Sequence, residues 1–138
     1  MRLFRVDENT RFHIDYTWFE KNGQDVNILI RKYLSPEQLE QYTRDQLDET
    51  FDFVDPDTAE VHHITRAAYL VRAEMQHNPN FLHQGLPIAE AVFRIFLVNN
   101  NQPLTVAELA AYLNRRPADV IAQIGGRNVY NGIRPIRN

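Results

Sequence analysis

Five arginines in the last third of the chain are the side chains best suited to bind a ligand. Residues 102–138 have a formal charge of +3, from Arg115, Arg116, Arg127, Arg134 and Arg137 against Glu108 and Asp119. Residues 1–101 hold the other ten basic and sixteen acidic side chains, a formal charge of −6. Arginine presents a planar fork of N–H donors that matches phosphate oxygens. A basic end on an acidic chain favours contact with a polyanion. The alternative is that these arginines pair with acidic side chains of the same protein.

Residue types and spacing support little other chemistry. The chain has no cysteine, which excludes disulfides, thiolate metal sites and cysteine nucleophiles. Its five histidines lack the spacing of metal ligands, and there is no nucleophile elbow and no glycine-rich phosphate loop. We therefore predict no enzyme activity, no metal site and no cofactor.

The chain shows no targeting or membrane signal. The first twelve residues carry charges throughout and lack the apolar run of a signal peptide. No apolar run approaches the roughly 20 residues that are needed to span a bilayer. We therefore expect a cytoplasmic protein that does not enter a membrane.

Two short helices are predicted to position the first arginines. Thr105 and Glu108 form a Thr-x-x-Glu capping box, and apolar residues recur at helical spacing over 106–113. Pro117 fits the first position of a second helix, where its missing N–H costs nothing. Gly125-Gly126 is expected to end this helix, because glycine readily adopts the left-handed conformation.

A β-hairpin is predicted to position the remaining arginines. Asn131-Gly132 lies between short β-rich runs and is typical of a type I′ turn. Residues 127–130 and 133–134 would form the two strands. Pro135 cannot donate a backbone hydrogen bond, so the second strand should lie at the edge of a sheet.

This order of helix, turn, helix and hairpin resembles the winged helix-turn-helix superfamily over about a quarter of the chain. The matching residues are the Glu108-Leu109-Ala110 step, with small Ala110 where the helices cross, then Leu113 and Val120. The chain departs from the pattern at the turn, where Asn114 stands in place of the usual glycine and Arg115 in place of an apolar residue. The resemblance implies that the second helix enters the major groove of DNA.

From this resemblance and the charge we predict a small DNA-binding protein, a transcription regulator. Arg115 and Arg116 are expected to contact phosphates at the start of the second helix, and Arg127 and Arg134 to reach the backbone or minor groove from the wing. The outward positions of the second helix are Ala118, Asp119, Ala122 and Gln123, of which only Gln123 suits base readout. Because a monomer of this kind would have poor specificity, we expect a dimer or a partner protein.

Two alternative functions use the same elements. The first is a protein-interaction module, in which the winged unit presents Ala118, Ala122 and Tyr130 to another protein and does not bind DNA. The second is a small-molecule pocket between the two halves of the chain, which would raise the melting temperature when it is filled.

The pattern of the whole chain predicts an α+β fold in which a winged helix-turn-helix, residues 86–138, packs on a mixed N-terminal half, residues 1–85. Two β-hairpins are expected in that half, from residues 3–6 with 12–15 and from 51–54 with 61–64. Helices are expected over residues 16–23, 25–33, 36–49, 65–77 and 88–98. The last of these is apolar nearly all round and must be covered on more than one side, which favours one continuous fold.

Overall fold

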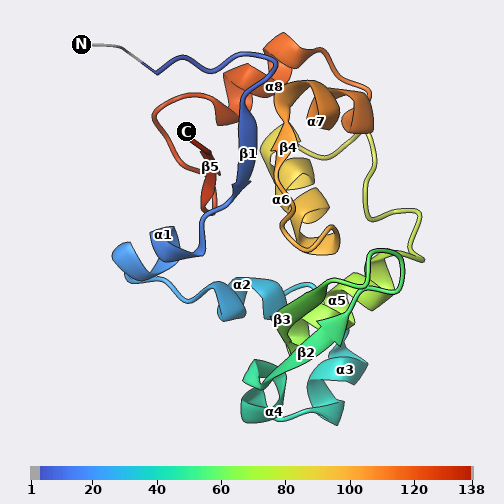
Figure 1. The fold of residues 1–138 in the computed structure, drawn as a ribbon. Helices are drawn as coiled ribbons and strands as arrows, with labels where there is room; N and C mark the ends of the chain where they lie inside the picture. Colours follow the sequence, from blue (N-terminus) through green and yellow to red (C-terminus); the bar gives the residue numbers. More distant parts are fainter. Residues whose placement is uncertain (1–3, 138) are drawn as a thin grey trace. The chain divides into compact units, whose positions relative to one another are not determined.

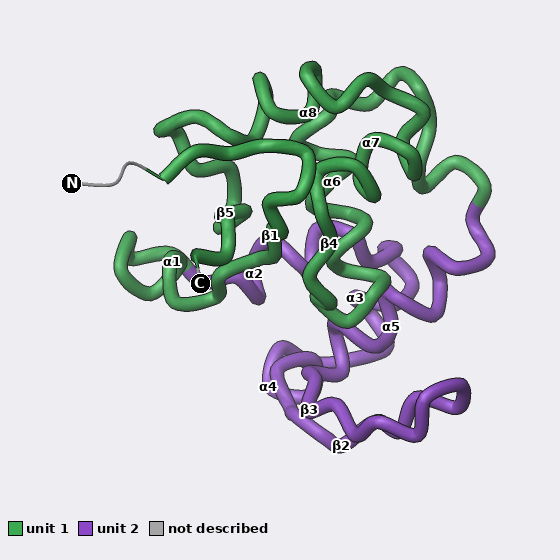
Figure 2. Tube along the Cα trace, turned by 45° about the horizontal axis from the view of Figure 1, so that its top comes forward, with its two compact units in different colours: residues 1–24, 79–138 green, residues 25–78 purple. Residues whose placement is uncertain are grey.

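The computed structural model describes residues 4–137, which form eight helices and two small antiparallel sheets (Figure 1). The predicted α+β class is confirmed. The chain divides into unit 1, residues 1–24 and 79–138, and unit 2, residues 25–78 (Figure 2). The prediction divided the chain between residues 85 and 86. The structure divides it elsewhere, because the first strand pairs with strands from the end of the chain.

The described part of unit 1 contains four helices and a three-stranded sheet. The helices are α1 (Tyr16–Lys21), α6 (Ile88–Val98), α7 (Val106–Leu113) and α8 (Pro117–Ile124). The strands are β1 (Arg11–Ile14), β4 (Leu104–Thr105) and β5 (Ile133–Pro135). They are antiparallel and lie in the order β4-β1-β5, so the strand nearest the N-terminus occupies the middle (Figure 1).

The side chains of β1 alternate between the core and the other face of the sheet. Phe12 and Ile14 are fully buried, whereas Arg11 is exposed and His13 is half-buried, as expected for a strand with one face on a core. Phe12 lies opposite both Leu104 and Pro135. The hairpin predicted between residues 3–6 and 12–15 is therefore wrong: residues 4–6 form no strand, and Leu3 lies outside the described residues.

The wing hairpin predicted over residues 127–134 is also wrong. Its turn is present, since Asn131 and Gly132 have φ of +46° and +78° and the Ile133 N–H donates to the Tyr130 carbonyl at 3.0 Å. However, residues 127–130 form no strand, and β5 pairs with β1 instead. The turn is specified locally, whereas the partner strand is selected by the apolar face that it can bury. β5 lies at the edge of the sheet, as Pro135 predicted.

Among the described elements of unit 1, helix α6 supplies the largest share of the core. Six of its eleven residues are buried, namely Ala91, Val92, Phe93, Ile95, Phe96 and Leu97. It packs against β1, α7 and α8, so the prediction of a helix covered on several sides is confirmed. Glu90 and Arg94, four residues apart on its more polar side, form an ion pair at 3.2 Å.

Helices α7 and α8 begin where the sequence predicts. The Thr105 hydroxyl accepts from the Glu108 N–H at 3.1 Å, and the Glu108 carboxylate accepts from the Thr105 N–H at 2.9 Å. Asn114 ends α7 in the left-handed region, with φ of +53°, which asparagine tolerates better than most residues. Pro117 is the first residue of α8.

Helix α8 ends at the predicted glycine, but the backbone conformation of that glycine is not the predicted one. Gly125 has φ of −92°, so the left-handed conformation expected there is wrong. A Cβ at this position would lie 2.7 Å from the carbonyl oxygen of Ile121, closer than a side chain tolerates. Glycine is therefore required here for close approach of the backbone.

Asn101 completes the hydrogen bonding of β1 where β4 ends. Its side-chain amide accepts from the Ile14 N–H at 2.7 Å and donates to the Ile14 carbonyl at 2.8 Å, as a neighbouring strand would. Its φ of +57° is in the left-handed region.

We expect Asn101→Gly to destabilise the protein by about 1–3 kcal/mol, because it leaves both backbone groups of Ile14 without partners. Asn101→Ala should cost roughly 1 kcal/mol more, because alanine also resists the left-handed conformation. Urea denaturation of the two variants separates these effects. Equal stabilities for Asn101→Gly and wild type would show that the amide bridge contributes nothing.

Unit 2 consists of a β-hairpin and four short helices in its described residues. The strands are β2 (Thr50–Val54) and β3 (Val61–Thr65), so the hairpin predicted here is confirmed. The helices are α2 (Val26–Arg31), α3 (Pro36–Gln41), α4 (Arg44–Asp48) and α5 (Arg66–Met75). The single helix predicted over residues 36–49 is wrong, because Thr43 and Gln46 form a capping box that starts a new helix.

Candidate nucleic-acid interface

An open hollow of about 560 Å³ lies in unit 1 at the C-terminal end of α8. Its lining comes from the N-terminal segment, the last turn of α8, the loop after it, and strands β1 and β5. The basic side chains in it are Arg127, Arg134 and Arg137, accompanied by His13, and the one acidic side chain is Asp15. Three guanidinium groups around one hollow, with a single carboxylate, form a site suited to an anion.

Pairing of β1 with β5 brings His13 and Arg134 together. The two residues lie opposite each other in the register, on the face of the sheet away from buried Phe12 and Ile133. The Arg134 guanidinium donates to the Asp15 carboxylate at 3.2 Å. This ion pair is partly exposed, so its main effect is to orient Arg134 rather than to stabilise the fold.

Asp15 keeps its charge because of its place before α1. It accepts from the Thr17 hydroxyl at 2.6 Å and from the Thr17 N–H at 3.0 Å, as an N-cap residue does. The bond from the Thr17 hydroxyl holds the pKa of Asp15 below its usual range, and the charge of Arg134 acts in the same direction. The carboxylate that orients Arg134 is therefore ionised at neutral pH.

The N-terminal segment and the end of the chain form one side of the hollow. The Ile136 N–H donates to the Arg11 carbonyl at 2.8 Å, which extends the pairing of β5 with β1. Beyond it, the Arg137 guanidinium lies over the Phe4 ring, 4.7 Å from its centroid. A cation held over an aromatic face in this way loses little of its ability to donate from its edges.

Arg115 and Arg116 lie at the other end of α8, away from the hollow. Arg115 donates one N–H to the Gln84 carbonyl at 2.7 Å, and Arg116 pairs with Asp119 on its own helix at 3.0 Å. Arg116 remains 83% exposed in its side chain. A helix of eight residues is about 12 Å long, so the arginines form two groups separated by roughly that distance.

The structure thus brings together two of the five residues predicted to bind DNA, Arg127 and Arg134. Gln123 and Ala122 are exposed near the C-terminal end of α8, and Ala118 is exposed at its N-terminal end. Among the described residues, Arg127 has no ion-pair or hydrogen-bond partner.

The sequence prediction did not include His13 or Arg137 among the site residues. His13 stands in a strand predicted to pair with residues 3–6, so its position opposite Arg134 could not be foreseen. Arg137 contributes to the predicted charge of this region but lies beyond the last strand that the sequence predicts. The alternation of charged and apolar residues over 11–14 was the available signal for His13.

Tyr130 is held to α6. Its hydroxyl donates to the Glu90 carboxylate at 2.6 Å. Desolvation and this hydrogen bond raise the pKa of Tyr130 to about 12. The residue that the protein-interaction hypothesis placed against a partner therefore anchors the loop after α8 to the core helix.

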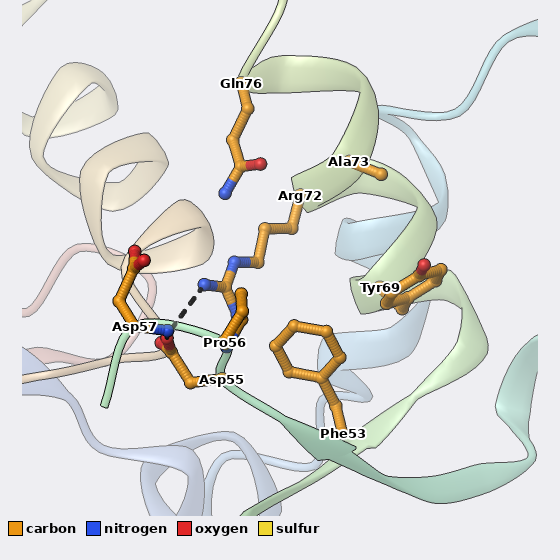
Figure 3. Close-up of a pocket in the computed structure, with 8 residues that line it drawn as sticks. All are labelled: Phe53, Asp55, Pro56, Asp57, Tyr69, Arg72, Ala73 and Gln76. Carbon is orange, nitrogen blue, oxygen red and sulfur yellow. Dashed lines mark hydrogen bonds and ion pairs between the residues drawn. The ribbon is translucent and has the colours of Figure 1, made fainter. Parts of the chain in front are cut away.

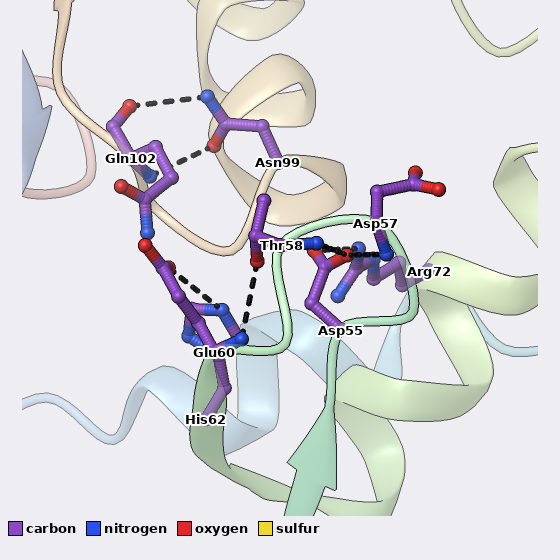
Figure 4. Close-up of polar contacts among 8 residues, drawn as sticks. All are labelled: Asp55, Asp57, Thr58, Glu60, His62, Arg72, Asn99 and Gln102. Carbon is purple, nitrogen blue, oxygen red and sulfur yellow. Dashed lines mark hydrogen bonds and ion pairs between the residues drawn. The ribbon is translucent and has the colours of Figure 1, made fainter.

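A smaller hollow, of about 230 Å³, lies in unit 2 between α5 and the β2–β3 loop (Figure 3). Arg72 lies over the Phe53 ring at 5.0 Å and pairs with Asp55 at 3.7 Å. Asp55 also accepts from the N–H groups of Asp57 and Thr58, as Figure 4 shows, and the bond from Asp57 lowers its pKa. In this hollow Arg72 pairs with Asp55, and Asp57 adds a second carboxylate, so the hollow is a weaker candidate for an anion than the basic one in unit 1.

Comparison of the chain with protein-family models, curated proteins and solved structures finds no match. Within residues 4–137, no group of three or more His, Asp or Glu side chains is arranged to hold a metal ion. No helix in the same range combines the length and the apolar character that crossing a bilayer requires.

Proposed function

We propose that unit 1 binds DNA and that it contacts the phosphate backbone with arginines at both ends of α8. The observation that carries this proposal is the convergence of Arg127, Arg134 and Arg137 on one open hollow. Each guanidinium offers five N–H donors, so the contacts of Arg134 with Asp15 and of Arg115 with Gln84 leave further donors for phosphate oxygens.

The distribution of charge between the units supports the proposal. Unit 1 contains ten basic and seven acidic side chains, a formal charge of +3, and unit 2 contains five basic and eleven acidic ones, a formal charge of −6. The division by units gives the same two formal charges as the division by chain order, so the charge asymmetry predicted from the sequence persists in the fold. Such an asymmetry orients a protein toward a polyanion.

The spacing of the two arginine groups also supports it. They lie at the two ends of a helix about 12 Å long, and the major groove of B-DNA is about 12 Å wide. In this arrangement Arg115 and Arg116 reach the phosphates on one side of the groove, and the arginines of the hollow reach those on the other side. Gln123 is the one residue on the exposed face of α8 with a side chain suited to a base edge.

The proposal includes a modified wing. In a winged helix-turn-helix, two strands that follow the second helix pair with each other. Here β5 follows α8, and its partner is β1 from the start of the chain. The place of the wing tip is then taken by the N-terminal segment and by Arg137, so these residues are the ones that would lie along the DNA backbone.

Salt dependence tests the proposal. Binding of a fluorescent duplex, followed by anisotropy at several salt concentrations, is expected to weaken steeply as salt rises. With five phosphate contacts the slope of log K against log salt should be about −4.5. Replacing Arg115 and Arg116 together by alanine should flatten this slope by about 2. Arg44→Ala, which removes an exposed cation from unit 2, is the control and should leave the slope unchanged.

Absence of duplex binding at low salt would refute the proposal. The protein-interaction module would then be the better hypothesis, and substitution of the exposed Ala118 and Ala122 by glutamate should weaken self-association or capture of a partner. A slope that is unchanged in the Arg115 and Arg116 variant would confine the DNA contact to the hollow.

A further inference from the structure

We propose that the basic hollow of unit 1 takes a single unpaired nucleotide, with its phosphate against the arginines and its base on the apolar floor. This inference rests on the proposed function, since it names the form of nucleic acid that the same face prefers. It makes the protein a reader of strand ends and unpaired positions rather than of continuous duplex alone.

The size of the hollow is the first argument. A volume of about 560 Å³ falls within the range of pockets that enclose small organic ligands, roughly 300–1,000 Å³. A phosphate group alone needs far less space. The backbone of an intact duplex is a convex ridge, which would touch the rim of such a hollow and leave its floor unfilled.

The apolar floor is the second argument. Val6 of the N-terminal segment and Val129 of the loop after α8 are half-buried in the lining, and they supply this floor together with Ile124 at the end of α8. Contact with such an apolar surface contributes no favourable binding free energy for phosphate and sugar oxygens. The face of a base does gain from it, and this face is accessible only when the base has left the stack.

The arrangement of the arginines is the third argument. Arg134 is oriented by Asp15, Arg137 lies over Phe4, and Arg127 is in the loop between α8 and β5. These three side chains, one from the loop after α8 and two from β5 and the residues after it, line the same hollow as the apolar residues. A nucleotide places its phosphate and its base only a sugar apart, which matches a cationic rim next to an apolar floor.

Three DNA molecules with the same sequence test the inference. The first is a blunt duplex, the second carries one extra unpaired nucleotide at one end, and the third carries an abasic sugar-phosphate at that position. We expect the unpaired nucleotide to raise affinity about tenfold over the blunt duplex, and the abasic group to lose most of this gain. Thymidine 5′-monophosphate, in millimolar amounts, should shift the NMR signals of the Val129 and Ile133 amides, which tests a free nucleotide as the occupant.

A variant that fills the hollow provides the control. Val129→Trp keeps every arginine and should abolish both the preference for the unpaired nucleotide and the shifts caused by the monophosphate. Val54→Trp, at an exposed valine of unit 2, is the matched substitution and should change neither.

The outcomes separate the two proposals. Equal affinity for the three DNA molecules, with no amide shifts, overturns the inference and leaves duplex binding intact. Amide shifts by the monophosphate without binding of any DNA support a nucleotide site and refute the proposed DNA-binding function. Binding of the unpaired nucleotide that survives in Val129→Trp places the preference elsewhere and also overturns the inference.

Discussion

Phe12→Ala is expected to destabilise unit 1 by about 3–5 kcal/mol, the largest effect of any single substitution considered. Phe12 is fully buried at the centre of the three-stranded sheet, between Leu104 and Pro135. Removing its ring leaves a cavity that neither neighbouring strand can fill without giving up its register. Because a small protein is stable by only about 5–15 kcal/mol, such a loss approaches the whole stability of the unit.

The fluorescence of Trp18 allows the unfolding of unit 1 to be followed separately. Trp18 is the one tryptophan in the sequence and lies in α1, with its ring 5.1 Å from that of buried Phe19, so its fluorescence reports on unit 1. Urea titration of Phe12→Ala should show a much lower midpoint than wild type. Arg11→Ala, on the exposed face of the same strand, should change stability by less than about 0.5 kcal/mol. A loss below about 1 kcal/mol for Phe12→Ala would contradict the central position of β1.

Combined replacement of Arg127 and Arg137 by alanine is expected to weaken DNA binding about 100-fold. A hydrogen bond to a charged group contributes about 1.5–3 kcal/mol, so each arginine accounts for roughly tenfold or more. The slope of log K against log salt should also flatten by about 2, because two counterions fewer are released. Both arginines are exposed, so the fold should tolerate their loss.

Stability measurements distinguish the loss of a contact from the loss of structure. The double variant should unfold at the wild-type urea concentration, apart from the small contribution of the Arg137 contact with Phe4. Arg127→Lys with Arg137→Lys, which keeps the charge and removes the fork, should recover part of the affinity. A double variant that binds DNA like wild type would exclude the hollow from the interface.

Local signals in the sequence identified most of the elements correctly. The capping box of Thr105 and Glu108 and the turn at Asn131-Gly132 act over three or four residues, so the chemistry that determines them is contained in the pattern itself. The strong apolar character of α6 likewise predicted its burial. The single helix predicted over residues 36–49 is wrong because Thr43 and Gln46 form a second capping box, which starts a new helix.

The pairing of strands could not be read from these local signals. Phe12 and Leu104 are 92 residues apart, and the residues around each of them do not indicate that the two strands pair. Pairing each strand with the nearest β-rich run predicts two hairpins that the structure does not contain. Because the predicted partner of β1 was wrong, the sequence also gave no indication that His13 belongs to the site. Arg127 and Arg134 were identified by charge, whereas His13 joins them only through the pairing of β1 with β5.

The central position of β1 also has a consequence for the order of events during synthesis. β1 leaves the ribosome before both of its partner strands, which follow about 90 residues later or more, and this corresponds to roughly 5–20 s of translation. Unit 2 is one continuous segment, residues 25–78, and all of its own pairings are available before β4 has been made. We therefore expect unit 2 to fold on the nascent chain before β4 and β5 are made. During this period Phe12 and Ile14 of β1 are exposed and can bind a chaperone.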